Sequence, residues 1–120
     1  MLVKDVMSTR VETIAPTSNV RDCARKMDQV GVGLLPVSDK GKLVGVVTDG
    51  DLRRHMGDAL FRAKTGDIMT KRPKTVSPGM LVSAALEMIN ASRITALFVV
   101  DQGKPVGIIH VHDLLRAGVA

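Results

Sequence analysis

The chain of 120 residues has about the size of one average domain, and each half alone would be too small to bury a secure core without metals or disulfides. Its 17 Lys and Arg against 12 Asp and Glu give a net charge of +5, which favours anionic ligands in general but does not name one. The single cysteine, Cys23, excludes an internal disulfide, and the absence of Trp and Tyr removes the stacking side chains that single-stranded nucleic-acid binders use.

The chain begins with a short lead-in, Asp5-Val6-Met7-Ser8, that packs two apolar side chains. Residues 11–14 are predicted to be extended, because β-branched residues favour strands and residues before a proline avoid helix. A helix follows, with Thr17 or Ser18 as its N-cap, and apolar residues recur at helical spacing until Gly31 ends the run.

A hairpin and a second, short helix complete the first half. Strands are predicted over residues 34–37 and 43–47, and the polar residues 38–41 between them are typical of a turn. The short helix is predicted to start at residues 49–51. Residues 57–66 then connect the halves.

The second half repeats the first without a gap. Gly45 and Gly107 are 62 positions apart, as are Asp51 and Asp113, and about a third of the aligned positions are identical. The pattern predicts two α+β repeats, residues 1–60 and 61–120, each in the order strand, helix, strand, strand, helix and related by a pseudo-twofold axis with a cleft between them. The elements expected in the second repeat are an extended segment over residues 73–76, a helix over 81–92, strands over 96–100 and 105–109, and a helix over 113–117.

The sequence resembles known families in two respects, one general and one more specific. The element order, the repeat length, the Thr-x-x-Pro segments and the Gly-x-x-Thr-x-x-Asp motif that ends at Asp51 resemble a tandem pair of CBS domains, or Bateman module. The stretches T-D-G-D-L-R-R, D-I-M-T-K-R-P-K-T-V and H-V-H-D-L-L-R-A-G-V resemble the regulatory tail of bacterial arabinose 5-phosphate isomerases. The resemblance implies an adenosine nucleotide in the cleft and a homodimer. It also implies that the chain is either a stand-alone CBS pair or a regulatory fragment of an enzyme whose attached sugar-isomerase domain carries the catalysis.

The first repeat offers groups suited to such a ligand. The Asp51 carboxylate can accept hydrogen bonds from two neighbouring ribose hydroxyls, which contribute on the order of 1.5 to 3 kcal/mol each. The Thr48 hydroxyl and the free amides of the helix start can hold a phosphate, and Arg53 and Arg54 add positive charge. The base would be held by Leu35, Pro36 and Val37 together with the chain around Thr13.

The second repeat carries a parallel set with one departure. His110 stands where the CBS pattern has Ser or Thr; a neutral imidazole still donates one hydrogen bond, and a protonated one favours an anion, so phosphate binding there would depend on pH near neutrality. The candidate nucleotide-binding residues of this repeat are Thr75, Leu97, Phe98, Val99, His110 and Asp113.

Each candidate also has a structural interpretation. Asp51, Asp113 and Thr48 suit plain helix caps, and Cys23 suits a buried small hydrophobe. Thr13 and Thr75 suit extended strands, Phe98 suits the core, and His110, His112 and Asp113 could form a weak metal site.

Three functions remain open from the sequence. The first is a sensor that binds AMP, ATP or a nucleotide-sugar such as CMP-Kdo and regulates an isomerase; the second is a dimerisation module with an empty cleft. The third, nucleic-acid binding through the positive charge, is weak, and no motif of a nucleophile beside a base indicates an enzyme. Without a signal peptide or an apolar span, we expect a soluble, cytoplasmic protein that contacts neither nucleic acid nor membrane.

Overall fold

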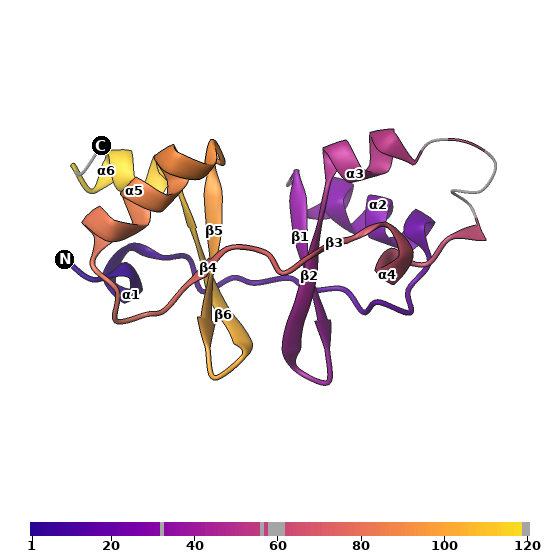
Figure 1. Cartoon of the computed structure of the whole chain (residues 1–120), viewed down its shortest axis with the longest axis horizontal. Helices are drawn as coiled ribbons and strands as arrows, with labels where there is room; N and C mark the ends of the chain where they lie inside the picture. The colour runs from indigo at the N-terminus through magenta and orange to yellow at the C-terminus, as the bar shows by residue number, and fades with distance from the viewer. Residues whose placement is uncertain (32, 56, 58–61, 119–120) are drawn as a thin grey trace. The chain divides into compact units, whose positions relative to one another are not determined.

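The computed structural model describes residues 1–31, 33–55, 57 and 62–118 (Figure 1). Its contacts divide the chain into two compact units. One is the continuous segment Glu12–Pro73, and the other joins Met1–Val11 to Lys74–Ala120. The predicted repeat boundary at residues 60 and 61, with Leu60 and Phe61 of the predicted connector, lies outside the described residues.

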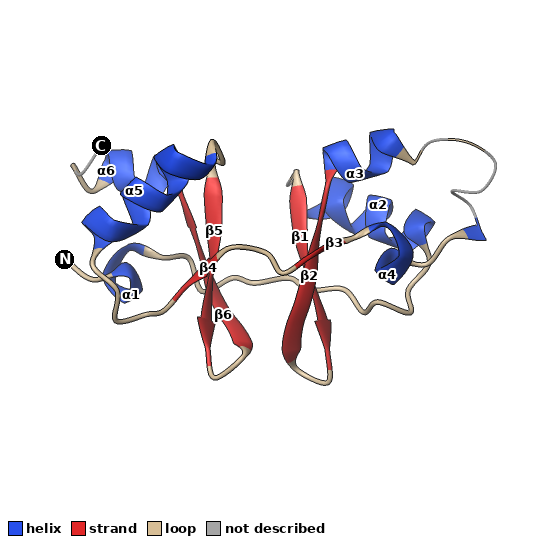
Figure 2. Ribbon diagram, viewed as in Figure 1, coloured by secondary structure: helices blue, strands red, loops and turns tan. Residues whose placement is uncertain are grey.

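The continuous unit is a three-stranded sheet with helices on one side (Figure 2). The strands lie in the order β1-β2-β3, and both pairs are antiparallel. Its elements in chain order are α2 (Val20–Val30), β1 (Leu34–Asp39), β2 (Lys42–Thr48), α3 (Asp49–Arg54), α4 (Thr65–Ile68) and β3 (Thr70–Lys71).

The unit formed by both ends of the chain has the same plan. Its sheet has the order β4-β5-β6, in which β4 runs parallel to β5, and β5 runs antiparallel to β6. Its elements are α1 (Val3–Val6), β4 (Thr75–Val76), α5 (Val82–Ser92), β5 (Ala96–Asp101), β6 (Lys104–His110) and α6 (Val111–Arg116). The predicted α+β class with two related repeats is confirmed.

Both predicted hairpins are present, and their turns are tighter than expected. Only Lys40 and Gly41 separate β1 from β2, with φ of 53° and 81°, and Gln102 and Gly103 repeat this at 51° and 81°. Two successive positive φ angles define a type I′ turn, whose twist matches that of the flanking strands. The strands β1 and β2 therefore extend into the segment 38–41 that was predicted to be the turn, and only its two central residues form the turn.

The helix over residues 20–30 is confirmed, but its cap is not the predicted one. The Asn19 side chain accepts a hydrogen bond from Asp22 N at 2.8 Å, so Thr17 and Ser18 lie outside the helix. Gly31 ends the helix in the left-handed region at φ 76°, a conformation that glycine adopts at little cost.

Each unit has its own hydrophobic core between the helices and one face of the sheet. Alternate residues of the first strand face the core, namely Leu35 and Val37 in β1 and Leu97 and Val99 in β5. Cys23 is fully buried in the core of the continuous unit, as predicted. Burial raises the pKa of its thiol, and a hydrogen bond with Thr65 opposes part of that rise.

Three sequence expectations were wrong in extent. Residues 11–14 form no strand: only Ile14 pairs with β1, through Ile14 N to Pro36 O at 3.1 Å and Ser38 N to Ile14 O at 2.9 Å. The expected segment over residues 73–76 shortens to β4. The last helix begins at Val111 rather than at Asp113, because His110 already caps it.

The one-turn helices α1 and α4 are each followed by a methionine, Met7 or Met69, that lies over a glycine. A Cβ on Gly45 in β2 would lie 2.6 Å from Met69 Sδ and 2.9 Å from the Thr70 carbonyl oxygen. A Cβ on Gly107 in β6 would lie 2.6 Å from Met7 Sδ. Both strands therefore need glycine at this position, and β3, which the sequence did not predict, lies beside Gly45 as a result.

Candidate functional site

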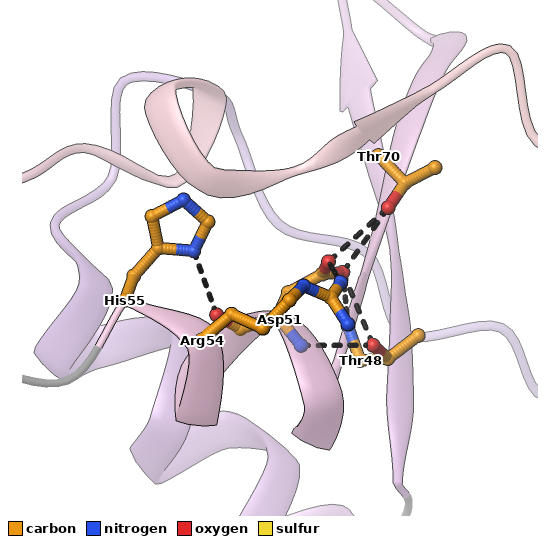
Figure 3. Close-up of polar contacts among 5 residues, drawn as sticks. All are labelled: Thr48, Asp51, Arg54, His55 and Thr70. Carbon is orange, nitrogen blue, oxygen red and sulfur yellow. Dashed lines mark hydrogen bonds and ion pairs between the residues drawn. The ribbon is translucent and has the colours of Figure 1, made fainter.

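The best-defined polar cluster lies where β2 passes into α3 (Figure 3). The Thr48 hydroxyl caps the helix by accepting from Asp51 N at 3.1 Å. In return, the Asp51 carboxylate accepts from Thr48 N at 2.9 Å and from the Thr48 hydroxyl at 3.1 Å. The structural interpretation of these two residues as a helix cap is thus confirmed, while their role with a nucleotide stays a prediction.

Two further groups donate hydrogen bonds to the Asp51 carboxylate. The Thr70 hydroxyl, 19 positions along the chain in β3, lies 3.2 Å and 3.4 Å from its two oxygens, and Arg54 Nη2 bonds to Oδ1 (Figure 3). Asp51 is only 2% exposed. Sequence reasoning missed Thr70; the only available signal was its place 62 positions after Ser8 in the duplication.

Cationic and imidazole groups surround this cluster. The His55 ring, through Nδ1, lies 2.9 Å from the Asp51 carbonyl oxygen. A Cβ on Gly50 would lie 3.2 Å from Arg54 Nη1 and 4.0 Å from Arg53 Nη2, so both guanidinium groups lie over Gly50. The predicted positive charge is present, although Arg54 is already paired with Asp51.

The equivalent cluster at the start of α6 has fewer donors. The Asp113 carboxylate accepts from His110 N at 2.8 Å and from Arg116 Nη2. Its side chain is 14% exposed, against 3% for Asp51.

His110 caps α6 through its ring. Nδ1 accepts from His112 N at 3.1 Å, and the two imidazoles are stacked with their centroids 4.5 Å apart. Because Nδ1 accepts, the neutral ring carries its proton on Nε2. Burial lowers the pKa of His110, the charges of His112 and Arg116 lower it further, and Asp113 opposes them.

The His110 cap predicts a loss of stability in mild acid. The folded-state pKa lies below that of the unfolded chain, near 6.5, so the stabilisation is complete above pH ~6.5 and is lost as pH falls through the folded-state pKa. We expect urea unfolding midpoints to fall from pH 7.5 to pH 5.5, and to fall less in His110→Thr, which carries the cap residue of the first repeat. Equal falls in both proteins would show that His110 does not contribute.

The strand residues proposed for the base divide between two faces. Leu35, Val37, Leu97 and Val99 point into the cores, so only their backbone can face a ligand. Pro36 and Phe98 are also buried but alternate to the other face of the sheet. Thr13 and Thr75 are partly exposed, and Thr75 lies opposite Phe98 in the β4–β5 pair.

The described residues contain neither a metal-ligand cluster nor a helix suited to a membrane. Among the residues that the structure describes, no three His, Cys, Asp or Glu side chains are placed to hold a metal ion, and this includes His110, His112 and Asp113. Within the same residues, every helix is too short or too polar to cross a membrane.

Comparison with known sequences identifies relatives of the whole chain. A family model described as "CBS domain" matches residues 3–58 and 66–120. The arabinose 5-phosphate isomerase KdsD of Yersinia pestis is 38% identical over 122 residues, which cover 98% of this chain and 37% of that protein. The chain thus spans little more than a third of the length of this relative.

Solved structures share the fold closely. The CBS domain pair of protein MJ0100, in complex with 5′-methylthioadenosine and S-adenosyl-L-methionine, has a TM-score of 0.86 at 26% identity, covering 98% of this chain and 95% of that one. CBSX2 in complex with AMP has a TM-score of 0.85 at 28% identity, covering 98% and 96%.

Proposed function

Because this chain belongs to the CBS domain family, we propose that it is a regulatory module that binds a nucleotide. The observation that carries this proposal is that two similar CBS pairs hold adenosine-based ligands: AMP in one, and 5′-methylthioadenosine with S-adenosyl-L-methionine in the other. Two features of this chain are in keeping with such a ligand. Each unit has a carboxylate, Asp51 or Asp113, in the first turn of the helix that follows a sheet strand, and the net charge of +5 favours a phosphate.

The protein under control would be a sugar-phosphate isomerase. The similarity to KdsD supports this, since the chain matches only part of that enzyme and brings no recognisable catalytic motif of its own. The ligand would be AMP, ATP or, for feedback by an end product, CMP-Kdo. It would act by binding one arrangement of a cytoplasmic homodimer better than another, which shifts their populations.

A thermal-shift screen tests nucleotide binding. We expect AMP, ADP, ATP, CMP or CMP-Kdo at a hundred times its dissociation constant to stabilise the fold by about 2.7 kcal/mol, which moves the midpoint by several degrees. Ribose 5-phosphate and inorganic phosphate serve as control ligands without a base.

The second candidate function is a dimerisation module with no ligand, and the exposed apolar side chains Met1, Leu81 and Leu115 favour it as a contact surface. Under this alternative no nucleotide shifts the midpoint, while the mass in solution, from light scattering, is that of a dimer. That pair of results would contradict the sensor proposal.

A further inference from the structure

The long helices of the two repeats differ in the residues that they expose. α2 carries five charged residues among its 11, whereas α5, which has the same place in the second repeat, carries only Glu87. The core of its own unit covers one side of α5, since its buried residues are Val82, Ala85 and Ile89. A surface helix normally keeps a polar face toward water, so the composition of α5 is that of a helix covered on a second side as well.

The outer side of α5 carries a continuous apolar seam. Its residues follow one another at intervals of three, four and three, the spacing at which one helix packs along another, and they are Leu81, Ala84, Met88 and Ala91. The first and last of them are exposed, and the middle two are partly exposed. The residues 62 positions earlier, on the outer side of α2, are all polar or charged, and they are Asn19, Asp22, Lys26 and Gln29.

Leu81 takes the place of a helix cap. At the equivalent position of the first repeat, Asn19 caps α2 by accepting from Asp22 N at 2.8 Å. Leu81 is the N-cap residue of α5, makes no side-chain cap hydrogen bond and is 56% exposed. Asparagine is favoured and leucine disfavoured at this position, because only asparagine satisfies a free amide of the first turn. The leucine stabilises neither the helix nor the core of its own unit, so a contact outside the unit accounts for it.

The neighbouring helix extends the apolar surface. α6 contacts α5, and its residue Leu115 is 51% exposed. The equivalent residue of the first repeat is Arg53. A polar or charged side chain of the first repeat is thus replaced by an apolar one at five positions of the same fold.

We infer that the α5 seam, with Leu115 beside it, is the surface through which two copies of this chain pair, the two α5 helices running antiparallel about a twofold axis. In that arrangement Leu81 faces Ala91 of the partner subunit, and Met88 faces Ala84 of the partner subunit. Every layer then joins one large and one small side chain, which fills the space between the helices evenly. The seam is thus complementary to itself, and this favours a second copy over an unrelated surface. The inference rests on the proposed function for the homodimer and names the surface that joins it.

Substitutions copied from the first repeat test this surface. Leu81→Asn, Ala84→Asp and Leu115→Arg introduce the residues that the first repeat carries at the same positions, so the fold should accept them, and circular dichroism checks this. A twofold interface contains each residue twice. In sedimentation equilibrium of the 120-residue chain, we therefore expect each substitution to raise the dissociation constant of the dimer about tenfold or more.

The matched controls make the reverse change in the first repeat. Asp22→Ala and Gln29→Ala copy Ala84 and Ala91 onto the exposed side of α2, and they should leave the dissociation constant as it is in the parent. A parent that stays monomeric at its highest soluble concentration overturns the inference. A dimer that the second-repeat variants leave intact, or that the controls weaken equally, also overturns it.

Cysteine crosslinking tests the antiparallel direction. Positions 81 and 91 are ten residues apart, about 15 Å along a helix, so cysteines there cannot bond within one chain. On air oxidation we expect the double variant Leu81→Cys/Ala91→Cys to form a covalent dimer and each single variant to form none, with Cys23 fully buried. A covalent dimer of Leu81→Cys alone would show parallel helices and overturn the arrangement.

Nucleotide binding is measured separately, by the thermal shift with AMP. A chain that pairs through α5 and responds to no nucleotide keeps the interface and contradicts the sensor proposal. A chain that responds to AMP as a monomer keeps the sensor and contradicts the interface. The two proposals can therefore fail independently.

Discussion

Asp51→Ala is expected to lower the free energy of unfolding by about 3 kcal/mol, and Asp113→Ala by only about 1 kcal/mol. Removing Asp51, which is 2% exposed, leaves the Thr48 amide, the Thr48 hydroxyl and the Thr70 hydroxyl without their acceptor, whereas the Arg54 guanidinium, which is 64% exposed, is readily hydrated. Removing Asp113 frees only the His110 amide and the guanidinium of Arg116, which is 77% exposed and readily hydrated. Urea unfolding of the two variants beside the parent measures the difference.

The two alanine variants control for each other, since both remove a capping aspartate of a six-residue helix. Thr70→Val isolates the long-range bond: it should destabilise the parent by about 1 kcal/mol and have almost no effect when Asp51 is already alanine. Equal losses for Asp51→Ala and Asp113→Ala would mean that the number of donors does not decide the stability of these clusters.

Gly45→Ala is expected to destabilise the protein by about 2 kcal/mol or more, although alanine normally suits a strand better than glycine. The new Cβ would lie 2.6 Å from Met69 Sδ and 2.9 Å from the Thr70 carbonyl oxygen. The sulfur can move aside, but the carbonyl belongs to β3, so the pairing of β2 with β3 must shift. Amide hydrogen exchange should show faster opening of Thr70 and Lys71 in the variant.

Gly79→Ala is the matched control. A Cβ on Gly79 meets no atom within 4 Å, and the φ of Gly79 is not positive. This substitution should therefore leave the free energy of unfolding within about 0.5 kcal/mol of that of the parent. Adding Met69→Ala to Gly45→Ala should recover part of the loss, because it removes the sulfur but not the carbonyl oxygen. A neutral Gly45→Ala would show that the methionine contact does not require glycine.

The parts of the fold that local patterns determine could be predicted from the sequence. The helical spacing of apolar residues in α2, the glycine after it and the two hairpins all depend on neighbouring residues, and the 62-residue duplication is found by comparing the two halves of the sequence. β3 could not be predicted, because Thr70 and Lys71, just before Pro73, form a strand only through their pairing with Gly45 and Val46.

In the candidate site, too, local features could be predicted and long-range contacts could not. Thr48 and Asp51 were found because a capping motif is local, and the cap interpretation was considered beside the functional one. What the motif could not reveal is the difference between the repeats: the bond from Thr70 joins residues 19 positions apart, and Ser8, its counterpart, makes a different bond. The sequence predicted two parallel sets of residues that differ at His110, with the first set preferred, and the structure adds that the two carboxylates accept from different numbers of donors.

The division of the chain into one continuous and one discontinuous unit also sets an order for folding during synthesis. The unit Glu12–Pro73 is continuous, so it has all its parts while residues after 73 are still being made. The other unit needs both ends of the chain, and Met1–Val11 must wait until β6 is made, where Ser8 bonds to Ile108. On a ribosome, residues 1–11 thus emerge before the continuous unit and reach their final contacts after it.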